Sequence, residues 1–174
     1  MNRNILFLFA LLVSLSVTSQ TKNAFDIART GTAAEMRELL KSNPDALNKA
    51  DSRGFTPLIL ACYRGNVEVA KFLIENVKDL NYKSPEGTAL AALSINYHPE
   101  LTEMLLRNNA DPDIADSNGT TPLIWAVKQG NEDLVALLIK YGAKKDKADN
   151  LGVTPFEYAM QIKKPNIINL LKTK

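Results

Sequence analysis

GFTPLILA, residues 54–61, decides the fold of this chain because the phrase recurs along the sequence. Its later versions are GTALAAL at 87–93, GTTPLIWA at 119–126 and GVTPFEYA at 152–159. Aligned on the threonine that all four share, the copies lie 32, 33 and 33 residues apart. A fixed period of this length is typical of a stack of similar helical units.

Each residue type in the phrase has a physical reason to be there. The glycine permits a positive φ in a tight turn, where a Cβ would clash. The threonine hydroxyl caps the free N–H groups of the next helix, and proline fits the first helical turn because its missing N–H is not needed there. The phrase therefore predicts a turn followed at once by the start of a helix.

The second half of each unit has apolar residues at helical spacing. They are Val67, Val69, Ala70, Phe72 and Leu73; Leu101, Met104, Leu105 and Leu106; Leu134, Val135, Leu137, Leu138 and Ile139. A two-helix unit has nothing of its own large enough to cover such a face, so we expect each unit to stack on its neighbours.

Further landmarks keep the same period. An aspartate or serine precedes each glycine by three residues, at Asp51, Ser84, Asp116 and Asp149, and each unit ends at Asn48, Asn81, Asp113 or Asp146. Together with the Gly-x-Thr-Pro phrase, these residues resemble the ankyrin repeat. The resemblance implies an all-α solenoid of about five helix-turn-helix units joined by short β-turn fingers.

We place the units at residues 23–48, 49–81, 82–113, 114–146 and 147–173 of a domain that spans 21–174. The first unit lacks the Thr-Pro turn, as expected of a terminal cap. Unit three departs from the pattern in its turns, because Ala89 replaces proline, Tyr97 replaces glycine and one turn residue is missing.

The amino terminus has the three regions of a secretory signal peptide over residues 1–20: a basic start with Arg3, an apolar run from Ile5 to Val13, and small polar residues. We expect export to the periplasm of a Gram-negative bacterium, or secretion. Cleavage would remove Arg3 and leave 20 of the 21 basic side chains against 19 acidic ones. A balance so near neutral disfavours nucleic acid as a partner. We expect no membrane association after cleavage and a monomeric protein.

Catalytic chemistry has no support in the sequence. His98 and Cys62 are the only histidine and the only cysteine, so no zinc ligand set and no Cys-His or Ser-His-Asp arrangement can be assembled. We interpret His98 as a turn residue and Cys62 as a buried thiol, and we predict no cofactor, no metal and no enzymatic activity. Trp125 is interpreted as a core residue in preference to a binding anchor.

Ankyrin arrays bind macromolecules through a concave side made of finger tips and exposed faces of first helices. Transferring those positions predicts a protein-binding surface of Ser52, Arg53, Phe55, Tyr63 and Arg64; Pro85, Glu86, Ile95 and Asn96; Ser117, Asn118, Thr120, Lys128 and Gln129; Asn150, Leu151, Val153 and Gln161. Arg53, Phe55, Tyr63 and Arg64 form its densest group of hot-spot residue types. The alternative is that Phe55 packs on neighbouring fingers and Tyr63 lies flat on its own helix.

The resemblance and the signal peptide together imply a non-enzymatic binding protein outside the cytoplasm. Similar exported bacterial ankyrin proteins include partners that support a periplasmic catalase. The alternative is an inhibitor, such as an immunity protein that occludes an exported toxin or hydrolase.

Overall fold

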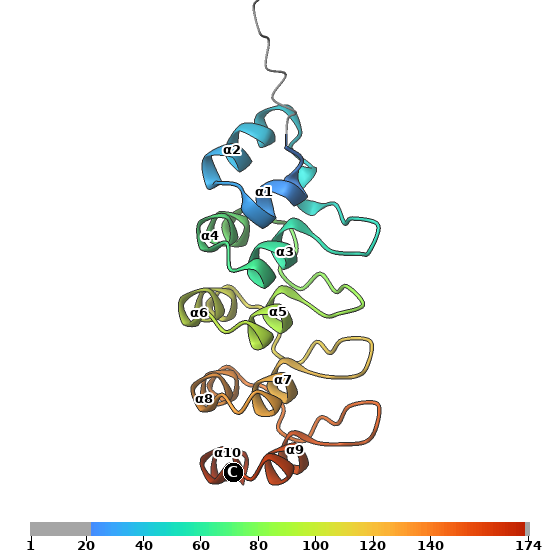
Figure 1. The fold of residues 1–174 in the computed structure, drawn as a ribbon, viewed down its shortest axis with the longest axis vertical. Coiled ribbons are helices and arrows are strands. Elements are labelled where there is room, and N and C mark those ends of the chain that lie inside the picture. Colours follow the sequence, from blue (N-terminus) through green and yellow to red (C-terminus); the bar gives the residue numbers. More distant parts are fainter. Residues whose placement is uncertain (1–21, 173–174) are drawn as a thin grey trace, which may run out of the picture.

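The computed structural model describes residues 22–172, which form a single ladder of helix pairs (Figure 1). The described chain contains ten α-helices, one 3₁₀ helix and no strand. The elements are α1 (Ala24–Thr30), α2 (Ala33–Ser42), η1 (Ala46–Asn48), α3 (Pro57–Arg64), α4 (Val67–Asn76), α5 (Ala89–Ile95), α6 (Pro99–Arg107), α7 (Pro122–Lys128), α8 (Glu132–Lys140), α9 (Pro155–Ile162) and α10 (Pro165–Lys172). The predicted all-α solenoid is confirmed. The predicted signal peptide lies outside the described residues.

The first helix of each repeat begins as the sequence predicts. In α3, α5, α7 and α9 the threonine side chain accepts a hydrogen bond from the backbone N–H three residues later, at 3.2 to 3.4 Å. Proline occupies the first turn of α3, α7 and α9. Unit three has Ala89 there, and its threonine caps α5 without help from a proline.

Two columns of helices share one core (Figure 1). The odd-numbered helices lie next to the fingers, and the even-numbered helices form the column behind them. Leu73, Leu105, Leu138 and Leu171 hold the same position in four consecutive units and are 0, 0, 0 and 7% exposed. The apolar faces of the second helices are therefore buried against the stack, as their spacing predicts.

Side chains at the unit ends tie each unit to the next. The side-chain oxygen of Asn48, Asn81 or Asp113 accepts a hydrogen bond from a backbone N–H 30 or 31 residues further on: Lys78 at 2.8 Å, Asp111 at 2.8 Å and Lys144 at 2.9 Å. These bonds account for the periodic Asn or Asp, because a short polar side chain reaches a neighbouring backbone that no helix satisfies.

The fingers are joined unequally. The N–H of Ser117 donates to the carbonyl of Pro85 at 2.8 Å, and the N–H of Asn150 donates to the carbonyl of Asn118 at 2.9 Å. Fingers three, four and five are thus linked in series. Finger three cannot donate the corresponding bond to finger two, because Pro85 has no N–H.

Unit three also differs within its own turns. Its finger is one residue shorter between glycine and threonine, and Ser84 and Gly87 exchange two backbone hydrogen bonds of 3.0 Å. Its two helices connect through Asn96, at φ −111°, and Tyr97, whose φ is not positive, whereas units two and four have a left-handed glycine at the position of Tyr97. The unit keeps its place in the stack despite these changes.

Within residues 22–172, no helix combines the length and apolar character that crossing a bilayer requires.

Candidate binding surface

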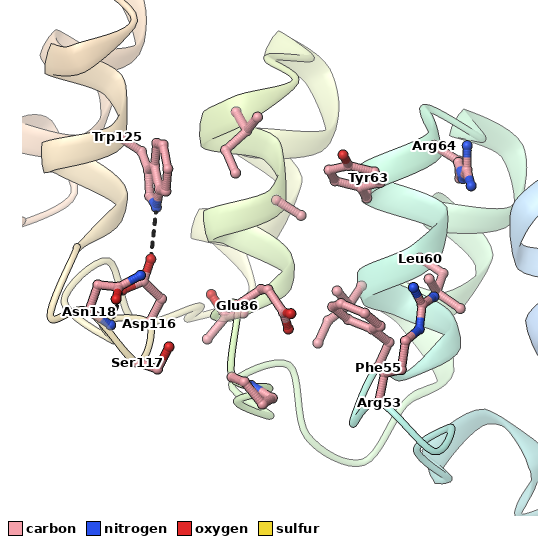
Figure 2. A pocket seen from close by; sticks show the side chains of 15 residues that line it. Arg53, Phe55, Leu60, Tyr63, Arg64, Glu86, Asp116, Ser117, Asn118 and Trp125 are labelled. Atoms are coloured by element: carbon pink, nitrogen blue, oxygen red, sulfur yellow. Dashed lines mark hydrogen bonds between the residues drawn. The ribbon is translucent and has the colours of Figure 1, made fainter.

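A hollow of about 560 Å³ lies on the finger side of units two to four. We call the surface made by the fingers and the exposed faces of α3, α5, α7 and α9 the finger-side surface, and this depression the unit-three hollow. Its lining comes from α3 with finger two, α5 with finger three, and α7 with finger four. Figure 2 shows Trp125 on one side and Phe55 and Tyr63 on the opposite side, with Glu86 between them.

The hollow brings together nine of the eighteen predicted binding residues. They are Arg53, Phe55, Tyr63, Arg64, Pro85, Glu86, Ile95, Ser117 and Asn118. Exposed predicted residues outside the hollow are Ser52, Asn96, Lys128, Gln129, Asn150, Leu151 and Gln161, and Val153 is partly exposed. Thr120 requires a correction: it is only 3% exposed, and its backbone N–H donates to Asp116 inside the finger. Its side chain offers nothing to a partner.

The hollow exists because unit three lacks bulk where its neighbours have it. Leu60, Ala92, Trp125 and Tyr158 occupy the same position of α3, α5, α7 and α9, and Ala92 is the smallest of the four. The residue missing from finger three is the counterpart of Phe55. Two deletions of side-chain volume thus fall in the same unit and leave a space that neighbouring walls enclose.

Trp125 corrects the sequence interpretation. It is partly exposed and lines the hollow, so it is not a core residue. Its indole Nε1 donates to Oδ2 of Asp116 at 3.3 Å, which fixes the ring against finger four (Figure 2). The Lys128 ammonium lies 5.2 Å from the Trp125 ring and 4.9 Å from the Tyr158 ring, at cation–π distance from both.

In unit five, the aspartate at the same repeat position also binds both the finger backbone and an aromatic side chain. Oδ1 of Asp149 accepts the backbone N–H groups of Leu151 and Val153, while Oδ2 accepts the Tyr158 hydroxyl at 2.5 Å. The Tyr158 hydrogen bond stabilises the carboxylate and holds the pKa of Asp149 below its ordinary value. The finger carboxylate therefore orders both the turn and an aromatic side chain nine residues later.

Phe55 and Tyr63 differ in how much they offer. Phe55 is half-buried against the core, and the Arg53 guanidinium lies 4.9 Å from its ring centre. Tyr63 is 49% exposed. The Phe55 ring packs on the core, which neither prediction described, and it also lines the hollow.

The charged groups of the lining are unequally engaged. Both oxygens of Asp116 accept hydrogen bonds, from Asn118 and Thr120 on one side and Trp125 on the other. Arg64 and Glu86 are exposed, and neither has an ion-pair partner among residues 22–172.

Sequence reasoning missed six lining residues: Ile59, Leu60, Thr88, Ala92, Asp116 and Trp125. The sequence assigns all six to the turn or to the packed side of the first helix. The signal that could have found the hollow is Ala92, a small residue in a row that is otherwise leucine, tryptophan and tyrosine.

His98 and Cys62 have structural surroundings. The Nδ1 atom of His98 caps α6 by accepting the N–H of Leu101 at 3.4 Å. Cys62 is buried, and desolvation raises the pKa of its thiol to about 12, so the nucleophilic thiolate is suppressed. Across the described residues, no group of three or more His, Cys, Asp or Glu side chains is arranged to hold a metal ion.

Comparison with known proteins agrees with the geometry. The family model for ankyrin repeats in three copies matches residues 17–84 and 88–174. The chain is similar to the ankyrin repeat, SAM and basic leucine zipper domain-containing protein 1 of mouse, with 29% identity over 128 residues, which cover 71% of this chain and 27% of that protein. The rabbit protein of the same name is 31% identical over 112 residues, covering 62% and 23%.

The chain therefore spans about a quarter of the length of these relatives. Two matches of the family model account for nearly all of the sequence, and the helix pairs, caps and fingers follow the same period. The chain belongs to the ankyrin repeat family.

Proposed function

We propose that this chain is a non-enzymatic binding module that acts outside the cytoplasm and holds a partner protein on its finger-side surface. Ankyrin repeat domains are interaction scaffolds, and the family membership supports a protein partner. The observation that carries the choice of surface is the unit-three hollow, where aromatic and arginine side chains from α3, α7 and finger two converge.

The residue types favour protein recognition over the alternatives. Aromatic and arginine side chains are enriched in the buried centres of protein interfaces. The hollow is lined by one tryptophan, one tyrosine, one phenylalanine and two arginines. Stacking does not need the exposed members, because the core lies on the other side of the first helices.

A capture experiment tests the surface. The triple variant Arg53→Ala, Tyr63→Ala, Arg64→Ala removes three exposed side chains and keeps the half-buried Phe55, so the fold should be retained. We expect the immobilised variant to lose the partner that the unmodified chain captures from an extract of the source cells. A control variant, Glu75→Ala, Arg107→Ala, Lys140→Ala, changes exposed residues on the second helices and should capture normally. Unchanged capture by the triple variant, with a normal melting curve, would refute this placement.

Export is the second half of the proposal, and it rests on residues 1–20. Fusing residues 1–25 to a reporter enzyme that is active only outside the cytoplasm should give activity. Replacing two leucines of the apolar run with arginine should abolish that activity. A reporter that stays inactive with the natural leader would contradict export.

The identity of the captured protein decides the role. Support of a stress-defence enzyme such as a periplasmic catalase is the role implied by the resemblance to exported bacterial ankyrin proteins. Recovery of a catalase would support it. Recovery of an exported toxin or hydrolase, together with inhibition of that enzyme by the purified chain, would favour the inhibitor role instead.

A further inference from the structure

Along the first helices, one position forms a row that faces the finger side: Leu60, Ala92, Trp125 and Tyr158. In this row the side chain of unit three stops at its Cβ, and the space beyond belongs to the unit-three hollow. The walls on both sides are fixed. Trp125 is held by the Asp116 carboxylate at 3.3 Å, and Phe55 packs against the core.

The floor and walls that a ligand would meet are apolar at the centre. Leu60, Ala92 and Ile95 contribute apolar side chains to the lining, together with the rings of Phe55 and Trp125. Water over such a surface gains few hydrogen bonds, so replacing that water with hydrocarbon favours binding. A single large apolar side chain would fill the position that Ala92 leaves empty.

The charges at the rim favour an acidic neighbour for that side chain. Arg64 has no ion-pair partner within residues 22–172, and Arg53 reaches Asp51 only at 3.9 Å. Asp51 also faces Arg29 at 3.5 Å, so Arg53 keeps donors to offer. The lining has two carboxylates: Asp116, whose oxygens already accept hydrogen bonds from finger four and Trp125, and Glu86, which is exposed. Among the exposed charged side chains of the lining, two guanidinium groups therefore stand against one carboxylate, and the buried Asp116 carboxylate lies beneath them.

We propose that the unit-three hollow is a socket for one large apolar side chain on an acidic segment of a partner protein, with Arg53 and Arg64 pairing with the carboxylates that flank it. The proposal rests on the proposed function, since it assigns the chemistry of the segment that the finger-side surface holds. It gives Ala92 a role in specificity: the smallest residue of the row makes the site.

The test selects phage-displayed 12-residue peptides on the purified chain, then measures binding of the selected peptides by the emission of Trp125, which is the only tryptophan and lines the hollow. We expect selected peptides to share a Phe, Trp, Leu or Met next to Asp or Glu, and to shift the Trp125 emission. Replacing that apolar residue with Ala should weaken binding at least tenfold. Selection of basic or wholly polar peptides, or binding without any change in Trp125 emission, would overturn the proposal.

Two variants of the chain locate the site. Ala92→Tyr places in unit three the side chain that unit five carries at the same position, and it should weaken peptide binding at least tenfold. Ala92→Ser, the control, should bind as the unmodified chain does. Arg64→Glu changes an exposed side chain, which keeps the test valid if Ala92→Tyr fails to fold. This variant should bind the acidic peptides more weakly, and it should bind matched peptides with Gln in place of Asp or Glu as the unmodified chain does.

The outcomes separate the socket from the binding surface as a whole. Full peptide binding by a folded Ala92→Tyr variant, while the Arg53, Tyr63, Arg64 triple variant no longer captures the partner, would refute the socket and leave the surface in place. Normal capture by the triple variant would refute both. Saturable binding of a nucleic acid or a lipid vesicle that competes with the selected peptides would also overturn the choice of a protein segment.

Discussion

Shortening one leucine in the middle of the stack and its counterpart at the end tests whether the chain behaves as a linear array. Leu105 in α6 and Leu171 in α10 hold the same repeat position and are 0% and 7% exposed. Leu105 has a complete unit on each side. For Leu171, the described units that flank it lie on one side only. The same chemical change at both places therefore compares position alone.

The magnitude follows from burial. Leu→Ala removes three buried carbon groups, worth about 2.4 kcal/mol at roughly 0.8 kcal/mol each. A cavity that stays open adds a further cost, so that fully buried Leu→Ala changes reach about 2–5 kcal/mol. We expect Leu105→Ala to lie in the upper half of that range, because flanking units prevent collapse. Leu171→Ala should cost about 2 kcal/mol or less, since an end unit can relax into the space.

Urea unfolding gives the two free energies, and hydrogen exchange followed by mass spectrometry shows where protection is lost. Leu105→Ala should increase exchange in α4, α6 and α8, whereas Leu171→Ala should increase exchange in α8, α9 and α10 only. In an array whose units contact only their neighbours, damage stays local. Equal losses of stability with equally spread exchange would refute the linear reasoning and indicate a single cooperative core.

Three further changes have outcomes that the structure fixes. Gly119 and Gly152 hold the same finger position, at φ +76° and +77°, but only at Gly119 would a new Cβ meet a backbone nitrogen of the next finger, at 2.7 Å. Chemical denaturation should show a cost of roughly 1–2 kcal/mol for Gly152→Ala and a larger cost for Gly119→Ala. Equal costs would argue against contacts between the fingers. The Tyr158 hydrogen bond lowers the pKa of Asp149 in the folded chain below its ordinary 3.8, so the ionised carboxylate stabilises the fold fully above pH 3.8 and less as the pH falls through the folded pKa. Asp149→Asn should therefore flatten the acid end of a plot of unfolding free energy against pH. An unchanged plot would contradict this assignment. Lys163 stands at φ +54° where units two and four have left-handed glycine, so Lys163→Gly should raise the melting temperature, and a lowered melting temperature would show that the lysine side chain contributes more than its backbone strain costs.

The fold was predictable because its determinants are local and repeat. The cap of Thr56, the left-handed Gly54 and the buried Leu73 each follow from one unit of sequence, and the period multiplies them. The position of Cys62 inside the core was predictable for the same reason.

The candidate site was predictable only in part, because it depends on coincidences between units. Trp125 was interpreted as a core residue because it shares the repeat position of Leu60, and Leu60 is indeed only 4% exposed. The difference arises next door: Ala92 and the shortened finger three leave the ring uncovered on one side. Conversely, Thr120 was taken for a surface residue, but it is buried where Phe55 is only half-buried. Aligning one unit with another shows which positions face the core, but not whether the adjacent unit covers the side chain that occupies such a position.

The proline at position 85 has a mechanical consequence. Within residues 22–172, backbone hydrogen bonds run from finger three to finger four and from finger four to finger five, whereas finger two meets finger three without one. We expect fingers three, four and five to move together as one rigid body and finger two to move independently of them. Arg53 belongs to finger two and Glu86 to finger three, so motion of finger two would widen the hollow above Ala92 on the Arg53 side and leave the Trp125 side unchanged.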